Sequence, residues 1–496
     1  MMRAMQRGLA ACLTILILGF AASAQTGDIT RGIRNFTLPN GLQLVVAVRP
    51  ELQLSAVNLT VNIGSIDDPP GQSGMAHILE HVTLSGSTSV GTLDAETEAN
   101  ALEELDRAYQ ALDRERRRQE PESAILVGLE RWFEQAQEAT KRACETGEIL
   151  GGRLEAHGAI GLNATTTADA TQFFTSIPNE EVELWLSLEA ERLQHPILRR
   201  FYSERNVVLR EVAGLTGGRP TMQERFLREI FPGAPAAQAL AGDPEQIKSI
   251  DRPAAFAYFR RFYRPENITI AVVGNVDPEK VYQLALHYFA KWQPAGTAEL
   301  PRSRREQPPL PASPAIRAFN SAAGPAILFA FPELASTPAH NAAVEAVAEL
   351  INSADLSPLR RRLVQEQSIA WSVAATANYP SQKQPAIFLV HVYGTSGSEP
   401  QLLAQDASAL LKSLNRSSDE DIAGAVLGAE MHIAAGLDDP PTLASLLALH
   451  QAINGDWRTP FVLLQALRTL TGNDVRAAAT DLPGSVPSAS VSIGAK

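Results

Sequence analysis

The chain has 496 residues, of which 45% are hydrophobic and 20% charged, so it can form two or three globular domains of ordinary composition. Its formal net charge of −12 argues against a nucleic-acid-binding protein, because such proteins present basic surfaces to phosphates. Charge and composition leave the other classes of soluble protein open, and the order of residues along the chain has to distinguish among them.

The first 24 residues are organised like a secretory signal peptide. Arg3 and Arg7 precede an apolar stretch at residues 9–20, which is too short to span a bilayer stably, and residues 22–24 form a small-residue cleavage site. No later stretch is apolar enough to cross a membrane. We therefore expect residues 1–24 to be cleaved and the mature protein to be periplasmic or secreted in a bacterium, without a membrane anchor.

A β-rich segment begins the mature chain. Residues 36–38 and 42–48 flank the sequence Pro-Asn-Gly, and Asn-Gly favours the positive φ angles of a tight turn, so these residues predict a β-hairpin. Residues 56–63 alternate between apolar and polar side chains and predict a third strand. A turn at residues 69–71 then leads into a helix.

That helix carries the most informative motif, His77-Ile-Leu-Glu80-His81. Residues three and four apart share one face of a helix, so both imidazoles and the carboxylate point the same way. Two such imidazoles can bind one Zn²⁺, and the carboxylate can take a proton from a water bound to the metal. This H-x-x-E-H order is the inverzincin motif. The alternative is a chance grouping on a helix, although the chain contains only nine histidines.

Residues 94–148 differ in character from the segments on either side. They are rich in Glu, Arg, Gln and Ala, and their leucines recur at a spacing typical of paired helices. Pro121 interrupts the pattern, so we expect a helical hairpin inserted in the first domain. A solvated spacer is one alternative interpretation of this segment, and a lid or partner contact is another.

After the insert, the pattern returns to that of a mixed domain and ends in a linker. Residues 294–314 are rich in Pro, Arg and Ser and poor in apolar side chains. The elements that we expect between the insert and the linker are strands at 161–166, 171–177 and 268–273 and helices at 180–193, 203–212, 255–262 and 278–292.

Beyond the linker the pattern restarts, and residues 489–493 are similar to the strand expected at 268–273. We therefore predict an α+β protein of two homologous α/β-sandwich-type halves, each an antiparallel-rich sheet with helices on one face. The predicted boundaries are 25–293 for the first domain, 294–314 for the linker and 315–496 for the second domain.

A catalytic zinc ion needs a third protein ligand and one open position for water. The amphipathic segment 204–211 offers Glu211, which can face inward while Arg205 and Arg210 stay in solvent. Glu204 lies two turns earlier on the same face and suits a role in orienting a ligand. The alternative for any helical glutamate is simple solvent exposure.

Taken together, three segments resemble the M16 (pitrilysin/insulinase-like) zinc metallopeptidases: G-M-A-H-I-L-E-H at 74–81, N-A-T-T at 163–166 and E-R-N-V-V-L-R-E at 204–211. The resemblance is strong over residues 35–292 and weak in the second half. It implies one Zn²⁺ per chain. The ligands that it implies are His77, His81 and Glu211.

The resemblance also implies roles for four further residues. Glu80 would be the general base and Glu204 an auxiliary carboxylate. Asn163 and Ala164 would lie on an edge strand that pairs with the backbone of a peptide substrate, a mode of binding with little sequence demand. The alternative for Asn163 is a turn residue.

The chain departs from the family pattern in two places. The separation of His81 from Glu211 is longer than usual, by about the length of the insert. In the second half, Val364 and Trp371 stand where members carry an Arg and a Tyr that hold the substrate, and neither can donate hydrogen bonds as that pair does. This pattern indicates the zinc-bearing half of a two-chain enzyme, and we expect a heterodimer with a zinc-less homologue that supplies the Arg/Tyr pair. A homodimer is also open.

The function predicted from the sequence is a zinc-dependent endopeptidase acting on oligopeptides or unfolded polypeptide segments. The first alternative is a non-catalytic M16-like scaffold or assembly subunit. The second is a metal-binding or substrate-capture protein that performs little or no chemistry. The intact set of His77, Glu80, His81 and Glu211 favours the enzyme over both.

Overall fold

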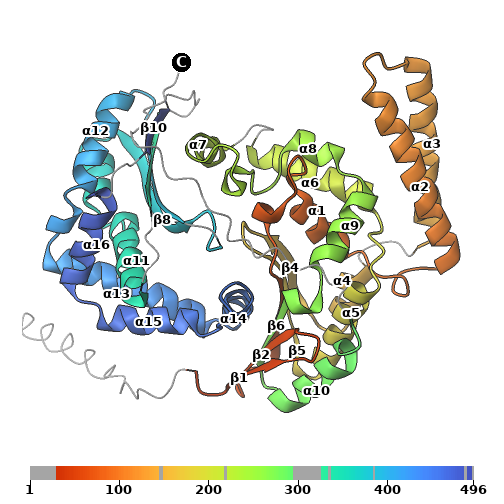
Figure 1. The fold of residues 1–496 in the computed structure, drawn as a ribbon. Coiled ribbons are helices and arrows are strands. Elements are labelled where there is room, and N and C mark those ends of the chain that lie inside the picture. The colour runs from red at the N-terminus through yellow and green to blue at the C-terminus, as the bar shows by residue number, and fades with distance from the viewer. Residues whose placement is uncertain are drawn as a thin grey trace, which may run out of the picture.

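The structure is a computed structural model, and Figure 1 shows its fold. The predicted signal peptide and the predicted linker lie outside the residues that it describes, so both remain predictions. Among the described residues, no helix combines the length and the apolar character that crossing a membrane requires. The described residues are 30–144, 149–216, 221–293, 325–332, 337–383, 386–484 and 489–493.

The first half is built on a six-stranded sheet in the order β1-β2-β6-β3-β5-β4. All neighbours are antiparallel except β2 and β6, which are parallel. The predicted hairpin is confirmed, because β1 pairs with β2 across the Asn-Gly turn. The strands are β1 (Ile33–Thr37), β2 (Gln43–Val48), β3 (Leu54–Val61), β4 (Ile160–Thr166), β5 (Thr171–Pro178) and β6 (Ile268–Gly274).

The helices of the first half bury their apolar sides against one face of this sheet and against each other, in the largest core of the molecule. Their sequences explain where they start, since an aspartate side chain caps α8, α9 and α10, and a proline occupies the first turn of each. The helices are α1 (Met75–Thr83), α4 (Ile149–Ala156), α5 (Val182–Gln194), α6 (Phe201–Thr216), α8 (Pro244–Ser249), α9 (Arg252–Phe262) and α10 (Pro278–Phe289).

The second half has a four-stranded antiparallel sheet in the order β10-β7-β9-β8. Its helices, apart from the one at Thr459–Thr469, pack on one face and form a separate core, and the helix at Thr459–Thr469 packs against other helices of this half. The strands are β7 (Ala326–Pro332), β8 (Ala370–Tyr379), β9 (Ile387–Gly394) and β10 (Ala489–Ile493), and the helices are α11 (Pro338–Asn352), the π-helical turn η5 (Arg360–Glu366), α12 (Pro400–Leu411), α13 (Asp419–Asp438), α15 (Thr459–Thr469) and α16 (Gly472–Gly484).

Each half covers the other half's sheet with one helix. Helix α14 (Pro440–Asn454) of the second half places Leu447 in a core with Val45 of the first sheet. Helix α7 (Met222–Ile230) of the first half places Phe226 in a core with Leu389 of the second sheet. The expectation of helices on one face only is therefore wrong. In the central strands β6 and β7, the side chains on both faces of the sheet are apolar and buried. The second face of each sheet therefore also needs a covering layer.

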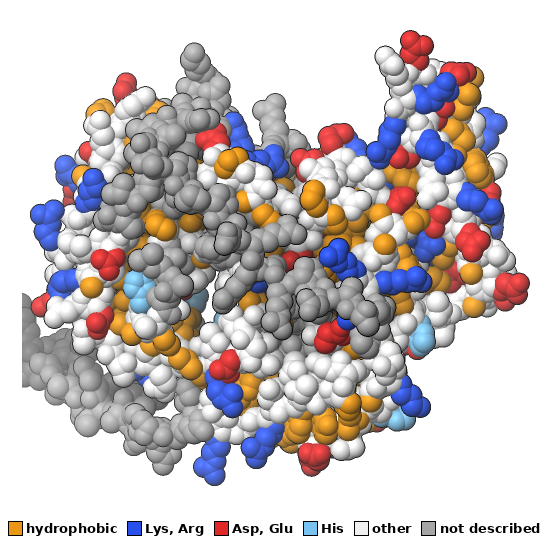
Figure 2. Space-filling model, in the orientation of Figure 1, with side chains coloured by type: hydrophobic (Ala, Val, Ile, Leu, Met, Phe, Trp, Pro, Cys, Tyr) orange, Lys and Arg blue, Asp and Glu red, His pale blue; other side chains and the backbone are white. Residues whose placement is uncertain are grey.

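The insert is the predicted helical hairpin. Helices α2 (Ala95–Arg116) and α3 (Ser123–Arg142) pack antiparallel and project from the body of the first half (Figure 1). The projecting part carries acidic, basic and hydrophobic side chains on its surface (Figure 2). At its base, Asp106 forms an ion pair with Arg252 at 3.0 Å. The base is therefore part of the domain, and the interpretation of the whole insert as a solvated spacer is wrong.

Candidate metal centre

Helix α1 turns its apolar residues inward and its histidines toward a more open side. Met75, Ile78, Leu79 and Val82 are fully buried at helical spacing. The side chains of the two histidines retain 13% and 18% exposure. The helix thus keeps its imidazoles within reach of solvent while its other side anchors it in the core.

The start of α1 is fixed by a buried carboxylate. The two oxygens of Asp68 accept hydrogen bonds from the backbone N–H groups of Gly74 (2.7 Å) and Ala76 (2.9 Å). Burial raises the pKa of Asp68 to about 7, and those hydrogen bonds oppose the rise. Gly74 has a φ of +99°, and a Cβ there would lie 2.6 Å from Ile247, so only glycine fits this junction.

The sequence-predicted ligands converge. The Nε2 atoms of His77 and His81 each lie 3.4 Å from Oε2 of Glu211, which α6 contributes. One ligand atom from each residue lies within 4.8 Å of the others, and no other group of three His, Cys, Asp or Glu residues in the described chain has this geometry. Two imidazole nitrogens and one carboxylate are a donor set typical of a catalytic zinc site, and they fit that ion.

Both imidazoles are oriented through their second nitrogen. Nδ1 of His77 lies 2.9 Å from the backbone carbonyl oxygen of Ala241, which can only accept a hydrogen bond, so Nδ1 carries the ring proton. The unprotonated Nε2 is then available to bind a metal ion. Nδ1 of His81 lies 3.8 Å from Oε2 of Glu204. The structure thus places Glu204 beside a candidate ligand, and its role in orienting that ligand remains a prediction. The Ala241 carbonyl has no sequence signal that would reveal it.

Burial by itself lowers the pKa of His81, but the carboxylates of Glu204 and Glu211 outweigh that effect, and the pKa is raised above its ordinary value. Glu80, Glu204 and Glu211 surround the two imidazoles, and their negative charge favours binding of a cation. A bound metal ion would displace the imidazole proton.

Glu80 is held by a residue that the sequence analysis missed. Its carboxyl is largely buried, with the residue 9% exposed, and Oε2 accepts a hydrogen bond from Oγ1 of Thr166 at 2.7 Å. Thr166 is the last residue of β4 and the last letter of the N-A-T-T segment. Membership of that segment was the only feature of the sequence that could have suggested a role for Thr166. Its contact with Glu80 on α1 depends on the fold.

Strand β4 lies at the edge of the first sheet beside α1. Asn163 and Ala164 are on this strand, so the alternative of a turn residue for Asn163 is wrong. The Asn163 side chain accepts a hydrogen bond from the backbone N–H of Ala164 at 2.9 Å. Pairing of this edge with a peptide remains a prediction.

The structure corrects the expectation for Arg205. We expected Arg205 and Arg210 to stay in solvent, and only Arg210 does. Arg205 is 8% exposed and donates hydrogen bonds to the Tyr109 hydroxyl at 2.6 Å and to the Ile250 carbonyl at 2.8 Å. The base of the inserted hairpin covers this side of α6, which no pattern within α6 could indicate.

In the second half, the two positions that depart from the family pattern lie on η5 and β8. Val364 is partly buried on η5, and Trp371 is 54% exposed and stacks on Tyr393 with 5.0 Å between ring centroids. Neither side chain can replace an Arg/Tyr pair as a set of hydrogen-bond donors.

Two family models match the chain. The model described as insulinase, peptidase family M16, matches residues 44–114, and the one described as the peptidase M16 inactive domain matches residues 249–427. The first match contains the H-x-x-E-H helix. The second spans the end of the first half and much of the second.

Among curated proteins, an uncharacterized zinc protease from Streptomyces coelicolor is 21% identical over 491 residues, which cover 95% of this chain and 93% of that protein. The zinc protease PqqE of Helicobacter pylori is 21% identical over 81% of this chain and 79% of its own length. For several other curated zinc proteases, the chain spans about half of the relative's length.

A solved protease structure from Helicobacter pylori is similar to this chain, with a TM-score of 0.74, 19% identity and coverage of 93% of this chain and 99% of that one. The first half of the periplasmic protease PqqL from Escherichia coli has a TM-score of 0.62 at 15% identity, covering 94% of this chain and 92% of that structure. In a second structure, described as the periplasmic protease PqqL from Escherichia coli, 48% of the chain is covered. These likenesses show a shared fold.

Proposed function

Since this chain belongs to the M16 peptidase family, whose curated members are named zinc proteases, we propose that it is a zinc-dependent endopeptidase that hydrolyses oligopeptides or unfolded polypeptide segments. The observation that carries the proposal is the convergence of His77, His81 and Glu211 from two helices on one point. One Zn²⁺ per chain would be held by these three residues.

The chemistry follows from the residues around that point. A zinc ion bound there would supply a Lewis acid and a water of lowered pKa. Glu80 would act as the general base: the carboxylate oxygen that Thr166 does not hold would accept a proton from the attacking water and pass it to the leaving amine. Glu204 keeps the His81 ring in place, and the Ala241 carbonyl does the same for His77.

Substrate binding by strand addition agrees with the position of β4. An extended peptide pairs with a sheet edge through main-chain hydrogen bonds, so the sequence of the peptide matters little. Asn163 and Ala164 are the residues that we assign to this contact. The edge lies beside α1, so a peptide bound there would run past Glu80.

The experiment is metal analysis and peptide cleavage on one fraction of the protein purified from its native source, together with any partner that co-purifies. We expect about one zinc per chain, cleavage of an unfolded polypeptide, loss of cleavage with a chelator and recovery with Zn²⁺. A zinc-free protein that cleaves nothing would favour the scaffold alternative. Bound zinc without cleavage in the presence of all partners would favour a capture protein.

We also propose a zinc-less homologue as partner, in a heterodimer, with a homodimer as the second arrangement. The support is the replacement of both hydrogen-bonding positions by Val364 and Trp371 and the match of this chain to half of PqqL. Co-purification from the native source tests it. Full peptidase activity from the purified chain alone would contradict it.

A periplasmic or secreted location is part of the same proposal. It is supported by the signal-peptide pattern of residues 1–24 and by the likeness in fold to a protease described as periplasmic. Fractionation of cells, with the mature N-terminus sequenced, tests it: we expect the chain to begin at Gln25.

A further inference from the structure

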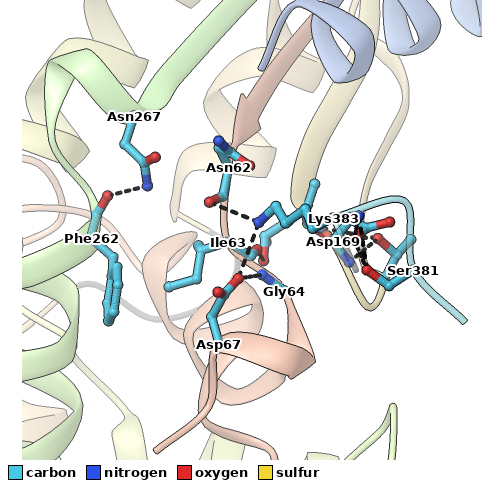
Figure 3. A network of polar contacts seen from close by, with 12 residues as sticks. Asn62, Ile63, Gly64, Asp67, Asp169, Phe262, Asn267, Ser381 and Lys383 are labelled. Carbon is cyan, nitrogen blue, oxygen red and sulfur yellow. Dashed lines mark hydrogen bonds and ion pairs between the residues drawn. The ribbon is translucent and has the colours of Figure 1, made fainter. Parts of the chain in front are cut away.

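The second half contacts the metal-binding region of the first half through the turn between β8 and β9. Figure 3 shows this contact, with Lys383 directed toward Asn62 and Asp67, and Ser381 beside Asp169. Ser381 is 1% exposed and the Lys383 side chain 8%, so these residues are buried in the other half of the molecule. We refer to residues 381–383 as the 381–383 turn.

Lys383 contacts the segment that leads into α1. Its Nζ donates to the Asn62 carbonyl at 3.1 Å and to Oδ2 of Asp67 at 3.1 Å. Asp67 ends the short 3₁₀ turn η1 (Ser65–Asp67), and the next residue, Asp68, caps α1. A buried lysine without its carboxylate is costly, so this ion pair selects one position of η1 relative to the second half.

The same turn contacts the loop between β4 and β5. The Asp169 carboxylate accepts hydrogen bonds from the Ser381 hydroxyl, from the Gln382 N–H at 2.7 Å and from the Lys383 N–H at 3.2 Å. Asp169 lies three residues beyond Thr166, whose hydroxyl holds Glu80. One short turn of the second half therefore reaches both segments that place the candidate base.

These two segments also contact each other. The Ser65 N–H donates to the Thr167 carbonyl at 3.0 Å, and the Ile66 N–H donates to the Ala168 carbonyl at 3.3 Å. A Cβ on Gly64 would lie 2.3 Å from the Ala168 oxygen, so η1 and the β4–β5 loop are packed as closely as glycine allows. The 381–383 turn closes a three-way contact with them.

We propose that the 381–383 turn, through Lys383, is a positioning element that sets α1 relative to β4 and so maintains the hydrogen bond from Thr166 to Glu80. Lys383 is a positioning residue because it acts through Asp67 on one side, while Asp169 ties the same turn to the β4–β5 loop. The inference rests on the proposed function, since Glu80 is the base of that function. It gives the second half a role in catalysis without any contact with the metal.

The test uses the full chain with Lys383→Met. We expect kcat to fall about 10-fold, the size of losing one hydrogen bond to a charged group, with zinc content and KM nearly unchanged. The double variant Lys383→Met/Thr166→Val should be no slower than Thr166→Val alone, because both changes remove the same hydrogen bond. If Lys383 contributed to stability alone, the losses of the two single variants would add in the double variant. Lys383→Arg, which keeps the charge, should recover most of the loss.

The matched control is Ser445→Ala. Ser445 on α14 accepts a hydrogen bond from Asn58 at 3.0 Å, which also joins the two halves but lies on the face of the sheet away from α1. We expect this variant to keep its kcat. Equal losses of kcat in Lys383→Met and Ser445→Ala, or no loss in either, would overturn the proposal.

Hydrogen exchange separates a failure of this inference from a failure of the proposed function, because it requires no activity. The amides of Gly74 and Ala76 should exchange faster in Lys383→Met than in Ser445→Ala, whether or not the protein cleaves peptides. Should Lys383→Met fail to fold, Asp169→Asn weakens the same contact and takes its place. Unchanged exchange in that variant also counts against the proposal.

Discussion

The two halves share a plan but differ in what they place on it. Each has a sheet with its own helices on one face and a helix from the other half on the opposite face. In the first half, α1 presents two histidines and a glutamate. In the second, α11 buries alanines and valines, and the described residues there contain no group of three potential metal ligands. The shared architecture requires only that the sheet faces be apolar. A potential metal site forms only where polar side chains are held in position by neighbouring segments.

The difference extends to the ion pairs. In the first half, Arg199 and Glu98 form a fully buried pair, and Arg199 also donates to the carbonyls of Ser85 and Ser87. It thereby ties the end of α1 to the start of α6, the two helices that carry the candidate ligands. In the second half, pairs such as Arg468 with Glu430 are exposed. Burial of charge in the first half serves the geometry of a site.

The largest expected effect comes from the candidate base. Glu80→Gln should lower kcat about 10²–10⁴-fold, because general base catalysis is lost, while zinc stays bound. The comparison in the second half is Glu345→Gln on α11, where burial raises the pKa of the carboxyl. We expect Glu345→Gln to leave kcat unchanged. Peptide cleavage and metal analysis measure both, and substantial turnover by Glu80→Gln would remove the base assignment.

The buried ion pair should dominate stability. Arg199→Met leaves Glu98 charged, buried and without its cation, and we expect a loss of about 3–5 kcal/mol in the free energy of unfolding. Arg468→Met removes an exposed pair of the second half and should cost about 0–1 kcal/mol. Denaturant unfolding monitored by circular dichroism measures both. Similar costs would mean that the two halves use ion pairs in the same way.

A smaller effect is expected at the sheet edges. Thr166→Val removes the hydrogen bond to Glu80 with little change of shape, and kcat should fall about 10-fold with KM unchanged. Thr376→Val makes the same change on β8, the edge strand of the described second sheet, and should have no effect on kcat. An unchanged kcat in Thr166→Val would show that Glu80 does not need this support.

The last comparison concerns α14, the helix that the second half places on the first sheet. Burial lowers the pKa of His450 to about 4. Between about pH 6.5 and pH 4, His450 binds a proton in the unfolded chain but not in the folded chain. The free energy of unfolding therefore decreases as the pH falls through this range. His450→Gln should flatten this part of the stability profile relative to that of the unchanged chain. Thermal unfolding of both proteins between pH 7 and pH 4 measures the difference.

Local pattern determined a large part of this protein from the sequence. The spacing of His77, Glu80 and His81 fixed a shared helix face, and the amphipathic segment with Glu211 offered the third donor. The Asn-Gly turn predicted the first hairpin, and the leucine spacing predicted the inserted one. Each of these depends on residues close together in the chain, where periodicity and turn preferences act directly.

Contacts between distant segments were decided by the tertiary structure alone. The Ala241 carbonyl behind His77, the hydroxyl of Thr166 on Glu80 and the burial of Arg205 all join elements that are far apart in sequence. The exchange of α7 and α14 between the halves belongs to the same class. The residues adjacent to a side chain in sequence do not determine which distant segment packs against it. These contacts form only when the apolar faces of both sheets are buried.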